Sequence, residues 1–401
     1  MRDLESIWSE AFLYAARNSP FYRERLARFR GVPRPDQVRP VDKSEVSARN
    51  EDLLCVPKER VAEMVTTSGT AGRPLLWMLT KSDLSRLSLN ERLSFECVGL
   101  TAGDVVLVAV TLDRCFIAGL AYWMGLQELG CAVVRTGMAS PMLVLETIER
   151  VRPTAIVGVP SFLRMVAGTA RERGVDLAGA SVRKAGEPIR DAALALNAAG
   201  RSIERDWNAR VYSTYGVTEL ASSLCECDAG GGGHLHEDLL QVEILDEAGQ
   251  PVPDGVVGEV VATTFGVEAM PLLRYRTGDC AALHRGACPC GRTSPRLGPV
   301  VGRRNHLLKL KGTSVFPSAI AAALDDTPGV GRYVILARTD GAGSDTVEVL
   351  VHGTVAPDVL RDVLQGRTKV APLVRVASSE EIERLQAPPN SRKRRWFVDL
   401  R

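Results

Sequence analysis

The sequence predicts an α/β protein: a large N-terminal domain of mixed, mostly parallel sheets and helices, a β-rich subdomain, and a small C-terminal α+β domain. Three observations lead to this fold class. Apolar strand-like runs alternate with helical ones up to residue 174, the texture becomes β-rich after Gly233, and a separate unit follows Gly302. A chain of 401 residues can bury a sizeable core in two or three domains. We expect a large domain at residues 1–302, with its β-rich part near 220–300, and a small domain at residues 303–401.

The expected elements follow in chain order. Residues 1–63 are charged and helix-rich, with the amphipathic helical piece Asn18–Leu26. Strands are then expected at residues 104–110, 131–134, 154–158, 241–246, 258–264, 272–275, 332–337 and 346–352, and helices at 116–129, 142–151, 161–174, 317–324 and 357–365. Because strands that alternate with helices of this length are joined by crossover connections, the first sheet should be mostly parallel.

Composition and charge exclude several classes of protein. A formal net charge of +2 gives no electrostatic case for binding nucleic acid. The longest apolar run, Cys115–Leu126, is too short to span a bilayer. The N-terminal residues MRDLESIWSE carry acidic groups where a secretory signal would be apolar. We therefore expect a cytoplasmic protein with no nucleic-acid or membrane partner.

The nine cysteines divide into two groups. Five stand singly among apolar residues and are expected to pack as small hydrophobes: Cys55, Cys97, Cys115, Cys131 and Cys280. The other four form two C-x-C pairs and, with two histidines, offer six metal ligands: Cys225, Cys227, His234, His236, Cys288 and Cys290. Spacing alone leaves open whether these residues bind a metal, because C-x-C is less typical of zinc than C-x-x-C and the segments are far apart.

Two motifs contain groups suited to holding phosphates. The segment Thr66–Pro74 combines four hydroxyls, two glycines and Arg73, which can surround a polyphosphate with N–H and O–H donors. It lacks the Walker spacing, and a loop of this composition alone is more often an ordinary turn than a phosphate site. The segment Tyr215–Glu219, after the strand-like Arg210–Ser213, offers a ring that can stack on a purine, a hydroxyl for a phosphate and a carboxylate for Mg²⁺.

Two further motifs contain groups suited to a ribose or a nucleotide. In the segment Arg274–Asp279, Asp279 stands at a turn after an expected strand, where it can accept two ribose hydroxyls or simply cap its own backbone. The basic residues of Gly302–Arg304 and Leu307–Gly312, at the expected domain junction, can contact nucleotide or be solvated.

The order and spacing of these motifs resemble the adenylate-forming superfamily of acyl-CoA synthetases and adenylation domains. Finer features are similar to its phenylacetate-CoA ligase branch: Asn18–Tyr22, Gly186–Pro188, Glu226–Cys227 with His234–Asp238, Cys288–Arg296, Val315–Ile320 and Val398–Arg401. The resemblance covers essentially the whole chain. It implies that ATP, Mg²⁺ and coenzyme A are used, and that a small, mobile C-terminal domain swings between two half-reactions.

The resemblance also implies a role for individual residues. Ser68, Gly69, Thr70, Gly72 and Arg73 would enclose the β- and γ-phosphates, and Gly186, Glu187 and Pro188 would join the nucleotide site. Tyr215, with Gly216, would lie against adenine, Thr218 near the α-phosphate, Glu219 on Mg²⁺, and Asp279 and Arg303 at the ribose. The catalytic residues would be Thr218, Glu219 and Lys393, the last being the lysine that contacts the acid and the α-phosphate. Cys227, His234, Cys288 and Cys290 would hold a structural Zn²⁺, with Cys225 as the spare.

The chain departs from the family in three places. Arg73 replaces the usual lysine of the phosphate loop, and Asn305–His306 replaces an acidic hinge. In the expected acyl pocket, formed by Asp113, Arg114, Phe116 and Gly119, relatives carry a wall rich in tyrosine and glycine. Asp113 and Arg114 either pair with each other or face a polar or charged substituent of the substrate.

Three functions are compatible with these features. The first is an ATP-dependent ligase that activates a small aromatic acid as its acyl-AMP and passes the acyl group to CoA. The second is a stand-alone adenylating enzyme that gives the acyl group to a carrier-protein thiol or an amine. The third is a catalytically idle relative that binds nucleotide, against which the presence of Glu219, Asp279 and Lys393 argues. A homodimer is compatible with each of them.

Overall fold

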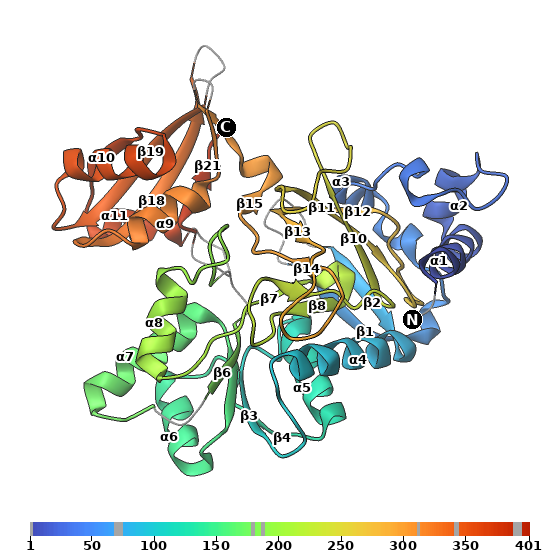
Figure 1. Cartoon of the computed structure of the whole chain (residues 1–401), viewed down its shortest axis with the longest axis horizontal. Coiled ribbons are helices and arrows are strands. Elements are labelled where there is room, and N and C mark those ends of the chain that lie inside the picture. Colours follow the sequence, from blue (N-terminus) through green and yellow to red (C-terminus); the bar gives the residue numbers. More distant parts are fainter. Residues whose placement is uncertain are drawn as a thin grey trace. The chain divides into compact units, whose positions relative to one another are not determined.

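A computed structural model describes residues 3–67, 75–177, 189–310, 313–340, 345–387 and 395–401, and the backbone alone of 181–185. The chain forms two compact units, Met1–Pro299 and Val300–Arg401. Figure 1 labels the elements of both units.

The first unit is built around a four-stranded parallel sheet of order β4-β3-β5-β6. Its elements, in chain order, are α1 (Leu4–Asn18), α2 (Pro20–Leu26), α3 (Lys43–Ala48), β1 (Val61–Thr66), β2 (Leu76–Thr80), α4 (Lys81–Cys97), β3 (Val105–Ala109), α5 (Ile117–Leu129), β4 (Ala132–Arg135), α6 (Pro141–Val151), β5 (Ala155–Gly158), α7 (Pro160–Arg173), β6 (Ser181–Ala185), α8 (Ala198–Trp207), β7 (Thr214–Val217), the 3₁₀ turn η4 (Thr218–Leu220), β8 (Ser222–Cys225), β9 (Gly233–His234), β10 (Leu240–Leu245), β11 (Gly258–Thr264), β12 (Tyr275–Ala281), β13 (Leu283–His284) and β14 (Arg296–Leu297). The short 3₁₀ turns η1 (Pro35–Gln37), η2 (Asn50–Leu53) and η3 (Lys58–Arg60) complete it.

Both faces of the parallel sheet are covered by helices. Leu107 and Ala109 of β3 pack with α6, α7 and α8 on one face, while Val106 and Val108 pack with α4 and α5 on the other. Figure 1 shows these two groups of helices on opposite sides of the strands. Side chains of a strand alternate between its faces, so a strand buried on both sides reads as a continuous apolar run. The expected strands at 104–110, 131–134 and 154–158 all occur, shifted by one residue at most ends. β3 and β5 are buried in this way, whereas β4, at the edge of the sheet, is only partly buried.

Local capping signals set the helix ends. Ser19 ends α1 and also begins α2, where its hydroxyl accepts the N–H of Tyr22, so the expected single piece Asn18–Leu26 is split in two. Thr80 and Asp83 form a capping box at the start of α4. Gly130 ends α5 in the left-handed conformation, at φ 90°.

The β-rich part contains the antiparallel strands β10, β11 and β12. Leu240, Val242 and Ile244 of β10 pack in the core that also holds the N-terminal helices α1 and α2. The strand expected at 272–275 is wrong in position, because β12 starts at Tyr275 and continues to Ala281. The turn that was expected at Asp279 is instead a bulge inside this strand.

Arg86 of α4 ties several distant segments of the first unit together. Its guanidinium is buried and donates to the carbonyls of Phe265, Leu239 and Ala221, the last at 2.9 Å, and to the Ser222 hydroxyl at 3.2 Å. Burial lowers the pKa of Arg86 to about 10, which leaves it charged at neutral pH. The same side chain therefore fixes η4 and β8 against the ends of β10 and β11.

The second unit has a four-stranded sheet of order β20-β19-β18-β21. Its elements are β15 (Gly302–Arg303), η5 (Arg304–His306), β16 (Leu308–Leu310), β17 (Thr313–Val315), α9 (Pro317–Asp325), β18 (Val330–Thr339), β19 (Asp345–Gly353), α10 (Pro357–Thr368), β20 (Leu373–Val376), α11 (Ser379–Gln386) and β21 (Phe397–Asp399). Helices α9 and α10 pack on one face of the sheet and α11 on the other. The strands and helices expected here all occur, each extended by one to three residues.

Arg401 links the start of the second unit to its sheet through hydrogen bonds and ion pairs. Its guanidinium donates to the carbonyls of Asn305 at 2.7 Å and Leu307 at 3.0 Å, and pairs with Asp345 at 2.9 Å and Asp399 at 2.7 Å. The expected hinge residues Asn305 and His306 form part of η5.

One expectation about the isolated cysteines is corrected by the exposure of the residue. Cys115 is exposed, so its assignment to the core is wrong; it lies in the loop before α5, with a left-handed φ of 55°. Among the described residues, no helix combines the length and the apolar character that crossing a bilayer requires.

Candidate functional site

The motif Tyr215–Glu219 crosses from a strand into a turn. Tyr215 and Gly216 lie on β7, which pairs antiparallel with β8, and Thr218 and Glu219 form the 3₁₀ turn between them. The chain reverses at Ala221, which adopts a left-handed φ of 43°. The expected strand at residues 210–213 does not occur. Instead β7 begins at Thr214, so that Tyr215 and Gly216 of the motif lie within the strand.

Glu219 is a buried carboxylate with two identified donors. Its residue is 3% exposed, and Oε1 accepts from Lys43 Nζ at 2.8 Å and from the Tyr275 hydroxyl at 3.0 Å. Burial and the neighbouring carboxylate raise the pKa of Tyr275 far above its usual range, so this phenol remains a donor. Sequence reasoning missed both partners, because their separations of 176 and 56 residues match no local motif.

Asp279 lies in the bulge of β12. Between the pairs Glu259–Cys280 and Val261–Arg276, β12 advances four residues while β11 advances two. Gly278, at φ 77°, lets the strand make this detour. Asp279 Oδ2 accepts the Tyr215 hydroxyl at 3.2 Å, and burial, together with the Asp279 charge, raises the pKa of Tyr215 well above its usual range.

Several expected site residues lie outside the described residues. These are Ser68, Gly69, Thr70, Gly72 and Arg73 of the phosphate loop, Gly186, Glu187 and Pro188, and the lysine Lys393. Arg303 is described on β15 and belongs to the second unit. The structure thus brings together Tyr215 and Asp279, and separately Glu219 with Lys43 and Tyr275.

The expected acyl-pocket residues surround the start of α5. Asp113 and Arg114 form an ion pair of 3.8 Å, and both side chains are about three-quarters exposed, at 76% and 74%. Phe116 is 40% exposed. Gly119 is buried, and a Cβ added there would lie 2.2 Å from the Thr111 carbonyl oxygen, so only glycine permits this approach of helix and loop.

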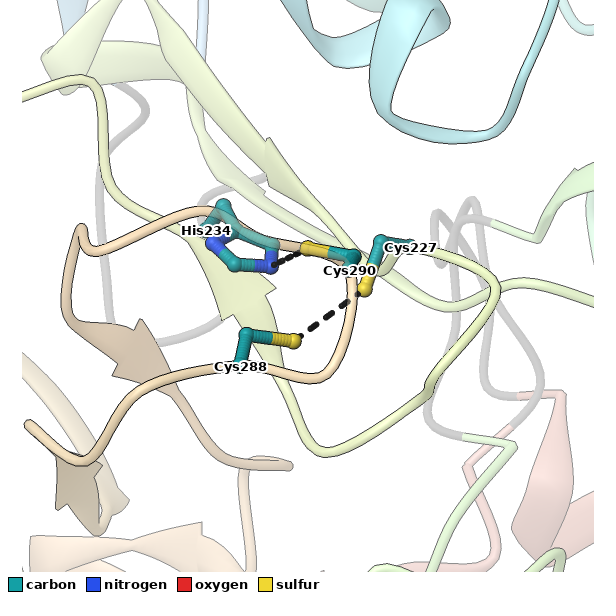
Figure 2. A group of neighbouring side chains, drawn as sticks. All are labelled: Cys227, His234, Cys288 and Cys290. Carbon is teal, nitrogen blue, oxygen red and sulfur yellow. Dashed lines mark hydrogen bonds between the residues drawn. The ribbon is translucent and has the colours of Figure 1, made fainter.

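Figure 2 shows a cluster of four side chains from two segments about sixty residues apart: Cys227, His234, Cys288 and Cys290. Their ligand atoms all lie within 4.8 Å of one another, with Cys227 Sγ to Cys288 Sγ and Cys290 Sγ to His234 Nε2 both at 3.5 Å. Tetrahedral zinc would separate such atoms by about 3.5–3.8 Å. Cys225 points elsewhere and donates to the Ser213 carbonyl.

The surroundings of the cluster suit a metal. The Ser294 hydroxyl lies 3.1 Å from His234 Nδ1, which leaves Nε2 directed at Cys290. Burial, and then Arg292 and Arg296, lower the pKa of His234 to about 4, so the imidazole is neutral at pH 7. For Cys290, burial opposes ionisation, but hydrogen bonds from Arg292, Cys288 and Cys227 together outweigh it and lower the thiol pKa to about 7. This donor set fits a closed Cys₃His zinc site.

Comparisons with known proteins cover most of the chain. The family model described as AMP-binding enzyme matches residues 18–268. The phenylacetate-coenzyme A ligase of Thermus thermophilus is 32% identical over 344 residues, which are 82% of this chain and 76% of that one. The enzyme of the same name from Pseudomonas putida is 28% identical over 362 residues, 86% of this chain and 79% of that one.

Solved structures agree on the fold. The 2-hydroxyisobutyryl-CoA ligase in its postadenylation state superposes with a TM-score of 0.82 at 22% identity, over 99% of this chain and 89% of that one. At this identity the likeness concerns the fold alone. The family match and the curated relatives carry the assignment: the chain belongs to the AMP-binding enzyme family, as an adenylate-forming, ATP-dependent acid–CoA ligase of the phenylacetate-CoA ligase type.

Proposed function

We propose that this enzyme activates a small aromatic carboxylic acid as its acyl-AMP and transfers the acyl group to CoA. Aromatic acids recur in the names of its relatives: phenylacetate-coenzyme A ligase, feruloyl-CoA synthase and 2-succinylbenzoate–CoA ligase. The observation that carries the proposal is the buried carboxylate of Glu219, held by Lys43 and Tyr275 at the turn after Tyr215. A buried, fixed carboxylate in a nucleotide-binding family is suited to holding Mg²⁺.

The first half-reaction asks the protein for positioning and charge neutralisation. A carboxylate oxygen of the acid attacks the α-phosphorus of ATP, and pyrophosphate leaves with its bonding electrons. Glu219 would hold Mg²⁺, which supplies positive charge to the phosphates when bound. Tyr215 would lie along the adenine, while Asp279, fixed by the Tyr215 hydroxyl, would accept the ribose hydroxyls. Thr218, half-buried at the start of η4, would donate to the α-phosphate.

In the second half-reaction the CoA thiolate attacks the acyl carbon and AMP leaves. One site must first hold ATP and the acid and then admit a thiol. We therefore propose that the large domain, residues 1–302, binds nucleotide and acid, while the small one, residues 303–401, carries Lys393 for the first step and then turns away. Hinge motion of this kind is a common gating device.

We also propose that Cys227, His234, Cys288 and Cys290 bind a structural Zn²⁺. The four-ligand set would leave no open position for substrate or water, so the metal would stabilise the two loops rather than take part in ligation.

Pyrophosphate exchange with a panel of acids tests this proposal directly. Exchange that depends on an aromatic acid, followed by thioester formation with CoA alone, is the expected result. Exchange without any CoA thioester would mean that a carrier-protein thiol or an amine is the acceptor. If no acid supports exchange, the idle nucleotide-binding alternative would stand.

A further inference from the structure

Lys43 makes a contact that none of the sequence motifs accounts for. It is the first residue of α3, and its Nζ lies 2.8 Å from Glu219 Oε1. The Lys43 side chain is 38% exposed, whereas the Glu219 side chain is 2% exposed. The ammonium group therefore sits at the boundary between solvent and a buried carboxylate.

Backbone pairing places this lysine in register with Tyr275. The N–H of Val41 donates to the Arg274 carbonyl at 2.8 Å, and the N–H of Arg276 donates to the Val41 carbonyl at 2.9 Å. Residue 41 thus pairs with the backbone on both sides of Tyr275, two residues before Lys43. The pairing at Val41 therefore places Lys43 and Tyr275 close together, and both donate to the same oxygen of Glu219.

The start of α3 fixes the lysine further. Asp42 is the N-cap of this helix, and Glu45 completes the capping box by accepting the N–H of Asp42 at 3.1 Å. Because the first turn of a capped helix is well ordered, the stem of Lys43 starts from a defined position. A long, flexible side chain loses less freedom in forming an ion pair when its base is held in this way.

A carboxylate with one oxygen fixed can still ligate a cation through the other. Lys43 and Tyr275 both approach Oε1, and Glu219 has a second oxygen, Oε2, with its own lone pairs. A buried carboxylate without such donors would be costly, and it would be free to rotate. Partners of this kind orient metal ligands in proteins and tune their affinity.

We infer that Lys43 is a positioning residue of the nucleotide site: its ammonium group holds Glu219, with Tyr275, in the orientation that presents this carboxylate to Mg²⁺. The inference rests on the proposed metal role of Glu219. It assigns to α3, in the N-terminal region of the chain, a direct influence on metal affinity.

Binding of Mn²⁺, followed by electron paramagnetic resonance in the presence of a non-hydrolysable ATP analogue, tests the inference without turnover. Lys43→Met should weaken Mn²⁺ affinity about tenfold, the lower end of what loss of a ligand's partner costs. Lys43→Arg should restore most of it. Lys58→Met, which removes a lysine whose side chain is 68% exposed and pairs with Glu51, is the matched control and should change nothing.

A double-mutant cycle tests the role of Lys43 separately from the proposed metal role of Glu219. If Lys43 acts through Glu219, Lys43→Met should add little to the loss caused by Glu219→Gln. If Glu219→Gln leaves Mn²⁺ affinity intact, the proposed metal role fails, and the inference with it. If Glu219→Gln weakens binding but Lys43→Met does not, or strengthens it, only the inference is overturned. An equal loss of nucleotide binding in EDTA would overturn it too, by making Lys43 a direct phosphate contact.

Discussion

The Tyr215 hydroxyl donates a hydrogen bond to Asp279 Oδ2 at 3.2 Å across 64 residues of sequence. Two of the residues expected at the nucleoside are therefore mechanically joined before any ligand binds. Tyr215 has an aromatic face and a polar tip, and these can serve different parts of the same ligand.

Tyr215→Phe should separate these two contributions. The variant keeps the ring but removes the donor that fixes Asp279, so we expect the KM for ATP to rise about tenfold with kcat little changed, as loss of one hydrogen bond to a charged group implies. Tyr215→Ala should raise KM further, because the ring is lost as well. Steady-state kinetics of acid-dependent pyrophosphate release measure both. Equal KM values for the Phe variant and the parent would show that the hydroxyl does not support Asp279.

Removing zinc should destabilise the protein without changing the chemistry directly. Metal analysis of protein purified without chelator should give about one zinc per chain. Cys290→Ser should lose the metal and lower the melting temperature, whereas Cys225→Ala, which changes a buried neighbour outside the cluster, should keep it. A fully folded protein without metal would exclude a structural zinc.

Lys393→Ala should separate the two half-reactions. We expect acyl-AMP formation to fall by several orders of magnitude, because a positive charge beside the α-phosphate would be lost. Thioester formation from supplied acyl-AMP should stay near the parental rate. Lys369→Ala, at the exposed end of α10, serves as the control in the same unit. Equal losses in both steps would assign Lys393 a structural role.

Gly119→Ala should disturb the start of α5. The added Cβ would meet the Thr111 carbonyl at 2.2 Å, so helix or loop must shift at a cost of about 1–3 kcal/mol, and the acid KM should change with it. Gly168→Ala, in the interior of α7 with no atom within 4 Å of the added Cβ, should instead stabilise by about 0.5–1 kcal/mol. Thermal unfolding of the two variants provides the comparison. Similar melting temperatures would indicate that the approach at Gly119 relaxes easily.

The second unit should lose stability in acid through Asp399. The hydrogen bond from Arg401 lowers the pKa of Asp399 below its usual 3.8, although burial opposes this. A carboxyl with a depressed folded pKa contributes stability above its unfolded pKa and loses it as the pH falls through the folded value. Arg401→Met should thus destabilise the unit at pH 7 and do so by less below pH 3.8. Hydrogen exchange of β18 and β19 measures this, and a pH-independent difference would contradict it.

Two central strands of the parallel sheet, β3 and β5, could be predicted because they are short and wholly apolar, whereas β6, with the sequence SVRKA, was not expected. Leu107 and Val108 both face helices, so burial on either side leaves a simple signature. The position of Asp279 could not be predicted in the same way. A bulge changes the register by packing and backbone geometry, and the only local hint was Gly278.

The site was predictable only where chemistry is concentrated in short segments. The four residues of the metal cluster each carry a ligand atom, and the resemblance selected them from six. Lys43 and Tyr275 were missed because their contacts with Glu219 depend on the backbone pairing of Val41, just before α3, with the residues on either side of Tyr275, which periodicity does not encode.

The four acceptors around Arg86 have a consequence for how the chain reaches its native state. They lie 135 to 179 residues away from the arginine along the sequence. If the guanidinium entered the interior before those acceptors were in place, it would lose its hydration and have no acceptors for its N–H groups. Formation of this part of the first unit should therefore be all-or-none and slow, since contacts of such long sequence separation close large loops. In a nascent chain that has not yet been synthesised as far as Phe265, α4 should be exposed to solvent. A fragment that ends before Phe265 should not retain the buried arrangement of Glu219.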